Sequence, residues 1–389
     1  MTAPTRLPNP FRPGFARTPP VLVGRQAVLG AAWEALNVAA LDGITPRELV
    51  LVGPRGVGKT VTLHEIASLA AETQSWPTVH VEVHPRAPFT PELVDGLGRA
   101  AHLLDHETQR RARTLRVKEA RLSAGIFGVG AETTLEVVPS QKHVASAMAL
   151  SNALTVAADV AIRQGAGLVI TMDEIQLASR NELALLGAVL QQNADKNWPL
   201  VIVLAGLPTI RAPRRSVTYL ERAEWHELGM VTDDQAVTAL VGPALTAHRP
   251  MDADAAAILA DAAGGYPYAI QVLGHHAWRA STGSSRIQAA HARKAVADAN
   301  QDMSAGLYAG RWADATDKER GYLTALASLI VAGAPTGGGD VARALGVGVK
   351  DVSYLRDNLL KKGTLYTVGR RLRLVTPGMA EWVLSQTQD

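Results

Sequence analysis

The chain has 389 residues, of which 47% are hydrophobic and 19% are charged; this composition excludes a disordered chain and favours two or three folded units. It contains no cysteine, so disulfides and thiolate metal sites are excluded, and its net charge of +3 permits nucleic-acid binding without requiring it. No signal-peptide core or membrane-spanning apolar run is present, so we expect a cytoplasmic protein without membrane contact.

Residues 1–20 are rich in proline and predict an extended, flexible arm. From residue 21, segments with helical periodicity alternate with short apolar runs. The runs that predict buried strands are residues 49–52, 78–83, 168–172 and 200–204. This alternation predicts a parallel α/β sheet over residues 21–230, with ligands at the carboxyl ends of its strands.

An insert at about residues 106–145 separates the second and third predicted strands. Its second half, residues 122–127 and 131–137, predicts a β-hairpin. Its first half is basic, through Arg110, Arg111, Arg113, Arg116, Lys118 and Arg121. These side chains suit either a solvated helix face or an element that touches nucleic acid or a neighbouring subunit.

Strand patterns stop at about residue 230. Residues 231–305 are alanine-rich with helical periodicity and predict a small helical lid. Residues 313–389 then show three helical segments followed by two short strands that turn at Gly369 and Arg370. Three helices and a hairpin are the pattern of a winged-helix domain.

The segment GPRGVGKT at residues 53–60 fits the phosphate-loop pattern and lies between a predicted strand and a predicted helix. Its glycines allow backbone amides to converge on phosphate oxygens. Lys59 would reach the β- and γ-phosphates of ATP, and Thr60 would give Mg²⁺ a hydroxyl ligand. The residues expected to contact the nucleotide are Gly53, Pro54, Arg55, Gly56, Val57, Gly58, Lys59 and Thr60.

Two acids follow the third predicted strand in LVITMDEIQ, residues 168–176. The strand would deliver both to the edge of the sheet where the phosphate loop lies. Asp173 would hold the Mg²⁺ shell, and Glu174 could orient and deprotonate an attacking water. These motifs together predict an ATPase.

The order of the segments resembles that of AAA+ ATPases. The segments that carry the likeness are VGRQAVLGAAWEAL, GPRGVGKT, LVITMDEIQ, VIVLAGLP and GGYPYAIQVLG, over about residues 21–300. They are most similar to the origin-recognition and helicase-loader branch and its prokaryotic relatives, which include transposition and STAND-type ATPases. The resemblance implies an AAA+-like α/β P-loop NTPase with a helical lid and a C-terminal winged helix.

The resemblance also implies further nucleotide contacts. Val23, Gly24 and Arg25 would lie near the adenine, and the lid segment around Pro267 would cover the base and ribose. Arg222 occupies the place of an arginine finger, which would act on the γ-phosphate of a neighbouring subunit. It could equally form a local ion pair with Glu221 or Glu224, and the rival fingers are Arg211, Arg214 and Arg215.

Two departures from the family pattern concern the prediction of ATP hydrolysis and leave the prediction of ATP binding unaffected. The strand at residues 201–204 runs into Ala-Gly-Leu-Pro, where many AAA+ proteins have a polar sensor. The lid has Gly-Tyr-Pro where the helicase-loader branch often has a sensor arginine. The second feature resembles STAND ATPases, which often act as slow nucleotide switches.

The C-terminal unit offers a basic surface. Its candidate DNA ligands are Arg356, Arg370, Arg371 and Arg373. A helix in the major groove and a wing on the phosphates would form a duplex-binding surface, although winged helices also bind proteins. We therefore expect an ATPase that forms homo-oligomers and engages duplex DNA, or alternatively a STAND-like switch in signalling or defence whose winged helix contacts protein.

Overall fold

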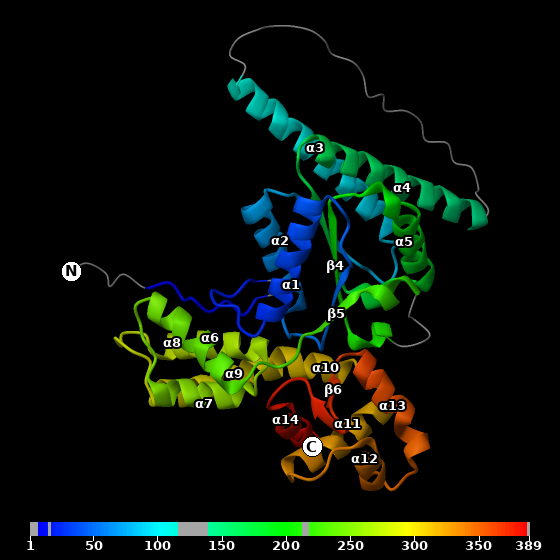
Figure 1. Ribbon diagram of the computed structural model, residues 1–389. Helices are drawn as coiled ribbons and strands as arrows, with labels where there is room; N and C mark the ends of the chain where they lie inside the picture. Colours follow the sequence, from blue (N-terminus) through cyan, green and yellow to red (C-terminus); the bar gives the residue numbers. More distant parts are fainter. Residues whose placement is uncertain (1–6, 15–16, 116–138, 212–217, 387–389) are drawn as a thin grey trace.

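The computed structural model describes residues 7–14, 17–115, 139–211 and 218–386; for residues 106–115 and 139–145 it describes the backbone alone. Its centre is a five-stranded parallel sheet with the order β2-β3-β4-β1-β5 (Figure 1). The strands are β1 (Leu49–Val52), β2 (Thr78–Glu82), β3 (Leu168–Asp173), β4 (Leu200–Gly206) and β5 (Glu224–Glu227). The sequence predicted the first four and missed β5.

Helices cover both faces of the sheet because its central strands are apolar on both sides. In β1, Leu49 and Leu51 pack against α1 (Gln26–Asn37) and α2 (Lys59–Gln74). Val50 and Val52 belong to the core on the opposite face, which is covered by α3 (Thr90–Leu115), α4 (Pro139–Arg163) and α5 (Arg180–Gln192). This arrangement confirms the predicted AAA+-like α/β fold.

Helices α3 and α4 lie side by side and extend beyond the sheet (Figure 1). They occupy both ends of the predicted insert, so the basic residues Arg110, Arg111 and Arg113 are on the last turns of α3. The expected hairpin at residues 122–127 and 131–137 lies outside the described residues, as do Arg116, Lys118 and Arg121.

After the last strand of the sheet, the chain forms a unit of four helices with its own core, called here the four-helix layer. They are α6 (Asp233–Thr246), α7 (Ala253–Ala263), α8 (Pro267–Ala280) and α9 (Ala289–Met303). Small side chains on these helices share one core with Ile270 and Leu273. Helix α6 begins with a capping box between Thr232 and Gln235. Pro267 is the first residue of α8, a position whose N–H has no partner within the helix, so proline costs no hydrogen bond there.

The chain then passes through α10 (Ala309–Ala313) into a last unit. Its elements are α11 (Asp317–Val331), α12 (Gly338–Ala344), α13 (Val349–Lys361), β6 (Leu365–Val368), β7 (Arg371–Leu374) and α14 (Met379–Ser385). Strands β6 and β7 form an antiparallel hairpin. Helix α14 inserts Met379 and Val383 into the core of the four-helix layer, so the last unit is docked on that layer. None of the helices in the described ranges is long and apolar enough to cross a membrane.

Candidate nucleotide site

The phosphate loop leaves β1 and ends where α2 begins at Lys59. Gly56 and Gly58 have φ angles of +79° and +91°, which L side chains rarely adopt. A Cβ on Gly53 would lie 2.1 Å from the carbonyl oxygen of Leu228. Glycine is therefore required for the loop to turn tightly around the amino end of α2, where backbone N–H groups favour an anion.

Lys59 is buried beneath this loop. Its Nζ donates hydrogen bonds to the carbonyl oxygens of Gly53 at 3.0 Å and Pro54 at 2.9 Å. Burial lowers the pKa of Lys59, whereas the nearby carboxylates of Glu174 and Asp173 raise it. A buried cation of this kind gains stability from a phosphate that enters the loop.

Thr60 and Asp173 meet at the carboxyl edge of the sheet. The Thr60 hydroxyl donates to Oδ2 of Asp173, whose residue is only 3% exposed, and Oδ1 accepts the amide of Glu174 at 2.7 Å. A hydroxyl and a carboxylate side by side are the hard oxygen ligands that Mg²⁺ takes beside nucleotide phosphates. The residues thus fit the ion that the sequence predicted here.

Glu174 is fixed by a residue that the sequence analysis did not single out. Its backbone has φ +52°, and its Oε2 accepts a hydrogen bond from Nε2 of Gln176. The amide oxygen of Gln176 accepts the backbone N–H of Leu207 at 2.8 Å, just after β4. Gln176 therefore bridges Glu174 to the end of the neighbouring strand, beside the Ala-Gly-Leu-Pro segment that lacks a polar sensor.

Gly206 explains why Gln176 fits there. A Cβ at this position would lie 2.7 Å from the amide oxygen of Gln176. The glycine that ends β4 thus leaves room for the bridging amide. Two features of the sequence could have indicated this contact. Gln176 follows Glu174 by two residues, and a glycine, Gly206, ends the next strand.

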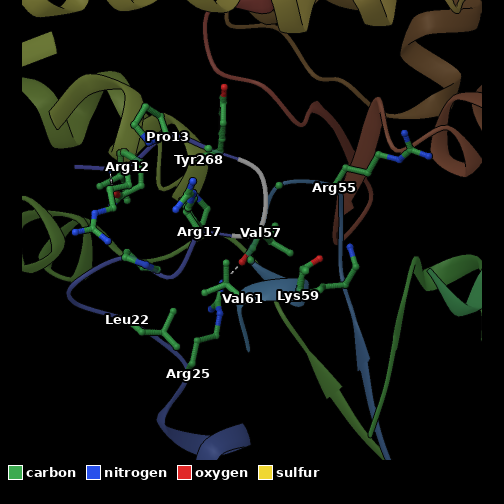
Figure 2. A pocket seen from close by; sticks show the side chains of 18 of the residues that line it. Arg12, Pro13, Arg17, Leu22, Arg25, Arg55, Val57, Lys59, Val61 and Tyr268 are labelled. Atoms are coloured by element: carbon green, nitrogen blue, oxygen red, sulfur yellow. Dashed lines mark hydrogen bonds between the residues drawn. The ribbon is translucent and has the colours of Figure 1, made fainter. Parts of the chain in front are cut away.

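These groups open into one cavity of about 680 Å³ (Figure 2). Lys59, Thr60, Asp173 and Glu174 line its polar end. The rest of the wall comes from the segment before α1, the start of α8 and the amino-terminal arm, and includes Val23, Arg25, Pro267, Tyr268, Ile270, Arg12 and Arg17. The volume lies within the range of small-molecule sites.

Arg25 lines this wall and also holds three backbone carbonyl groups by hydrogen bonds. It is 4% exposed, and its guanidinium donates to the carbonyl oxygens of Val57 at 2.6 Å, Gly24 at 2.9 Å and Gly229 at 3.2 Å. Burial lowers its pKa. The side chain ties the segment before α1 to the phosphate loop, and Gly24 beside it has φ +68°.

The amino-terminal arm differs from the expectation of a flexible segment. Phe11 is 2% exposed in the core of the four-helix layer, and a Cβ on Gly274 would lie 2.4 Å from its ring. Asn9 donates to the backbone carbonyl of His275 at 3.2 Å, and the amide of Arg12 donates to Gln271 at 3.2 Å. One aromatic anchor thus holds residues 7–14 in place despite the prolines, and Arg12 and Arg17 flank the cavity (Figure 2).

Arg222 lies away from this cavity. It ends the 3-10 turn Thr218–Arg222 just before β5, and β5 runs parallel to β1 with Leu49 opposite Glu224. It is therefore at the amino edge of the sheet, whereas the phosphate loop is at the carboxyl edge. Among its rivals, Arg211 pairs with Glu227 and stacks on Trp225, while Arg214 and Arg215 lie outside the described residues.

The candidate DNA ligands lie on two elements of the last unit, helix α13 and the β6–β7 hairpin. Arg370, Arg371 and Arg373 are exposed on the hairpin, with Leu372 buried between the last two. Arg356 is on α13 and is half-buried, with its guanidinium bound to Asp357 at 2.8 Å. The structure therefore brings three of the four together as an exposed basic cluster.

A phosphate loop after β1, paired acids at the end of β3 and a four-helix lid define an AAA+ fold of the P-loop class. In agreement, residues 21–203 match the family model described as AAA ATPase domain. Residues 305–383 match a separate model, a domain of unknown function (DUF8462). A comparison with curated protein sequences gave no match.

Solved structures share the fold over nearly the whole chain. A Walker-type ATPase of Pyrococcus abyssi is 16% identical with a TM-score of 0.61, covering 94% of this chain and 96% of its own. The ORC2 protein of Aeropyrum pernix, in ADPNP and ADP complexes, is 14% identical with a TM-score of 0.59, covering 97% and 96%. At these identities the likeness establishes the fold.

Proposed function

We propose that this chain is an ATP- and Mg²⁺-dependent ATPase that assembles into homo-oligomers and engages duplex DNA. The observation that carries the nucleotide part is the convergence of Lys59, Thr60, Asp173 and Glu174 on one cavity beneath the phosphate loop. The family match over residues 21–203 supports it.

The residues have separate roles in this proposal. Lys59 and the loop amides bind and orient the phosphates, and Thr60 and Asp173 hold the metal, which neutralises charge on the transferred phosphoryl group. Glu174 orients the attacking water and takes its proton, since Glu174 lines the cavity beside Lys59 and Asp173. Gln176 keeps that carboxylate in place through its bond to the β4 edge.

The DNA part rests on the exposed arginines of the β6–β7 hairpin. We propose that α11, α12, α13 and this hairpin form a winged-helix unit whose wing contacts phosphates. The α3 basic residues Arg110, Arg111 and Arg113 are a second candidate surface. The chain then works in the cytoplasm in a replication, helicase-loading or mobile-element role.

A second function, a nucleotide-controlled switch, has its own supporting observation. The last unit packs against the ATPase core: α14 joins the core of the lid, and a Cβ on Gly363 would lie 2.9 Å from Cγ of Arg55 in the phosphate loop. A unit in contact with the phosphate loop can respond to the nucleotide. In that case the winged helix would bind protein and turnover would be slow.

Titration of the purified chain with ATP and Mg²⁺ tests the nucleotide proposal. Lys59→Ala should weaken ATP binding by about 30-fold or more because a buried cation facing the phosphates is lost. Glu174→Gln should bind ATP normally and lose turnover by about 100-fold or more. Lys318→Ala and Glu72→Gln, at exposed positions, are the matched controls.

Normal ATP affinity in folded Lys59→Ala protein would refute the site. A wild-type chain that binds ATP but turns it over no faster with duplex DNA, and that binds duplex without salt dependence, would favour the switch.

A further inference from the structure

A second cavity of about 360 Å³ adjoins the nucleotide cavity. Both are lined by Arg55, Gly56 and Tyr268, so they meet at the phosphate loop. The far wall of the second cavity comes from α10 and the carboxyl end of α13, through Arg311 and Lys362. It therefore lies between the phosphate loop, the lid and the last unit.

Arg311 on α10 lines this cavity and has one unmatched donor among the described residues. Its Nη2 donates a long hydrogen bond, 3.5 Å, to the hydroxyl of Tyr266. Its Nη1 is buried and has no hydrogen-bond partner among the described residues. A buried guanidinium nitrogen without an acceptor is destabilising, so the site is suited to an anion.

Tyr266 places this arginine next to the phosphate loop. A Cβ on Gly56 would lie 1.9 Å from the Tyr266 hydroxyl, so the phenol rests directly on the loop. Glycine at position 56 is thus required both by its φ angle of +79° and by this contact. Arg311 is one hydrogen bond away from the residue that touches the loop.

The charges around Arg311 also favour an anion. Burial lowers the pKa of Arg311, the hydroxyl of Tyr266 raises it, and the nearby Arg55 lowers it. Lys362 is already paired, donating to Glu319 at 2.8 Å and to the carbonyl of Asp314 at 2.6 Å. Asp314 supplies the one carboxylate on the cavity wall, against the two guanidinium groups.

We infer that Arg311 is a phosphate-binding residue that reads the terminal phosphate of the bound nucleotide and gives the site its preference for a nucleoside triphosphate. The inference rests on the proposed function, because it needs a nucleotide in the adjoining cavity.

The position of α10 gives this contact a consequence. The helix connects the lid to α11, and Gly363 in the last unit lies against Arg55. A nucleotide that binds Arg311 is therefore in contact with the connection to the last unit.

Calorimetric titration of wild type, Arg311→Gln and Tyr266→Phe with Mg-ATP and, separately, Mg-ADP tests the inference. In Arg311→Gln the affinity for ATP should fall about 10- to 100-fold and the affinity for ADP less than about 3-fold. Tyr266→Phe keeps the ring and removes the hydroxyl that orients Arg311, so it should show a smaller loss, again selective for ATP. Arg293→Gln, an exposed change on α9, should leave both affinities unchanged.

Unchanged affinities in Arg311→Gln, or equal losses for ATP and ADP, would overturn the role of Arg311. If Arg311→Gln does not fold, as judged by circular dichroism and its melting temperature, Tyr266→Phe decides by the same criterion. Failure of the wild-type chain to bind either nucleotide would instead refute the proposed function, so the two failures are distinguishable.

Discussion

At the scale of single residues, the unusual feature of the site is that Glu174 does not stand alone. Its backbone is in the left-handed region, which a glutamate rarely adopts, and its carboxylate is bound by the amide of Gln176. Two constraints therefore fix the group that would activate water.

Gln176→Ala should separate positioning from binding. Without the amide, the carboxylate of Glu174 gains rotamer freedom, and kcat for ATP should fall about 10- to 100-fold. The Kd for ATP should stay within about 3-fold, because no phosphate ligand is changed. Steady-state kinetics and titration on the same preparation measure both, with Gln191→Ala as an exposed control on α5.

A parallel loss of ATP affinity and turnover in Gln176→Ala would mean that the residue holds the fold of the edge rather than the carboxylate.

The motif residues of the site were predictable from the sequence, and Gln176 was not. The phosphate loop and the paired acids are read from local spacing, because strand, loop and helix alone bring them to one edge. The bridge from Gln176 to Leu207 joins segments 31 residues apart, and its geometry depends on the glycine that ends β4. Such a contact follows from packing, which local patterns do not encode.

At the scale of elements, tertiary contacts again explain where the structure differs from the sequence-based expectation. Strand β5 reads Glu-Trp-His-Glu and lacks an apolar run, yet it pairs with β1 along its whole length. The tertiary pairing thus overrides a weak local preference. The same holds for the arm, where proline-rich composition predicted disorder and one phenylalanine anchors the chain.

Phe11→Ala should release that arm. The ring fills space in the lid core, so its loss removes the anchor of Arg12 and Arg17. Trypsin should then cleave faster after Arg17, whereas the bond after Arg12 precedes Pro13 and resists trypsin. Because both flank the cavity, ATP affinity should fall by about 3- to 10-fold. Limited proteolysis and nucleotide titration measure the two effects.

Gly274→Ala should reproduce this phenotype by crowding the same ring, and the exposed Pro8→Ala should not. If ATP affinity is unchanged while the arm is demonstrably cleaved faster, the arm does not contribute to the nucleotide site.

The hairpin offers a separate prediction. Replacing Arg370, Arg371 and Arg373 together by alanine should weaken duplex binding by a similar factor for all sequences. The slope of log affinity against log salt should fall by about one unit for each lost phosphate contact. Fluorescence anisotropy over a salt series measures this, and Arg180→Ala on α5 is a single-charge control remote in sequence from the hairpin.

ATP binding should survive in the triple variant, since these residues do not line the nucleotide cavity. Unchanged duplex affinity and salt slope would end the case for the hairpin and direct attention to the basic end of α3.

At the scale of the whole molecule, Arg222 and the phosphate loop lie at opposite edges of one sheet. The four residues of β1 separate them by roughly 13 Å along the strand, so Arg222 cannot serve the nucleotide of its own chain without rearrangement. A role in catalysis requires a neighbouring subunit.

Mixing tests this directly. Arg222→Ala and Glu174→Gln subunits should each be inactive alone, and their mixture should regain part of the ATPase activity. Some interfaces would then pair an intact Glu174 with an intact Arg222. No recovery in mixtures shown to co-assemble by size-exclusion chromatography would reduce Arg222 to a local ion-pair former.

The strand order also determines when the nucleotide site can form during synthesis. Strand β1, which carries the phosphate loop, is hydrogen-bonded to β4 and β5, so its neighbours are made roughly 150 residues later. A nascent chain therefore has no place for the loop until residue 227 has emerged. The family match ends at residue 203, inside β4, and a fragment cut there would keep Val203 opposite Leu49 as the one remaining partner of β1 on that side, with no strand on the other side.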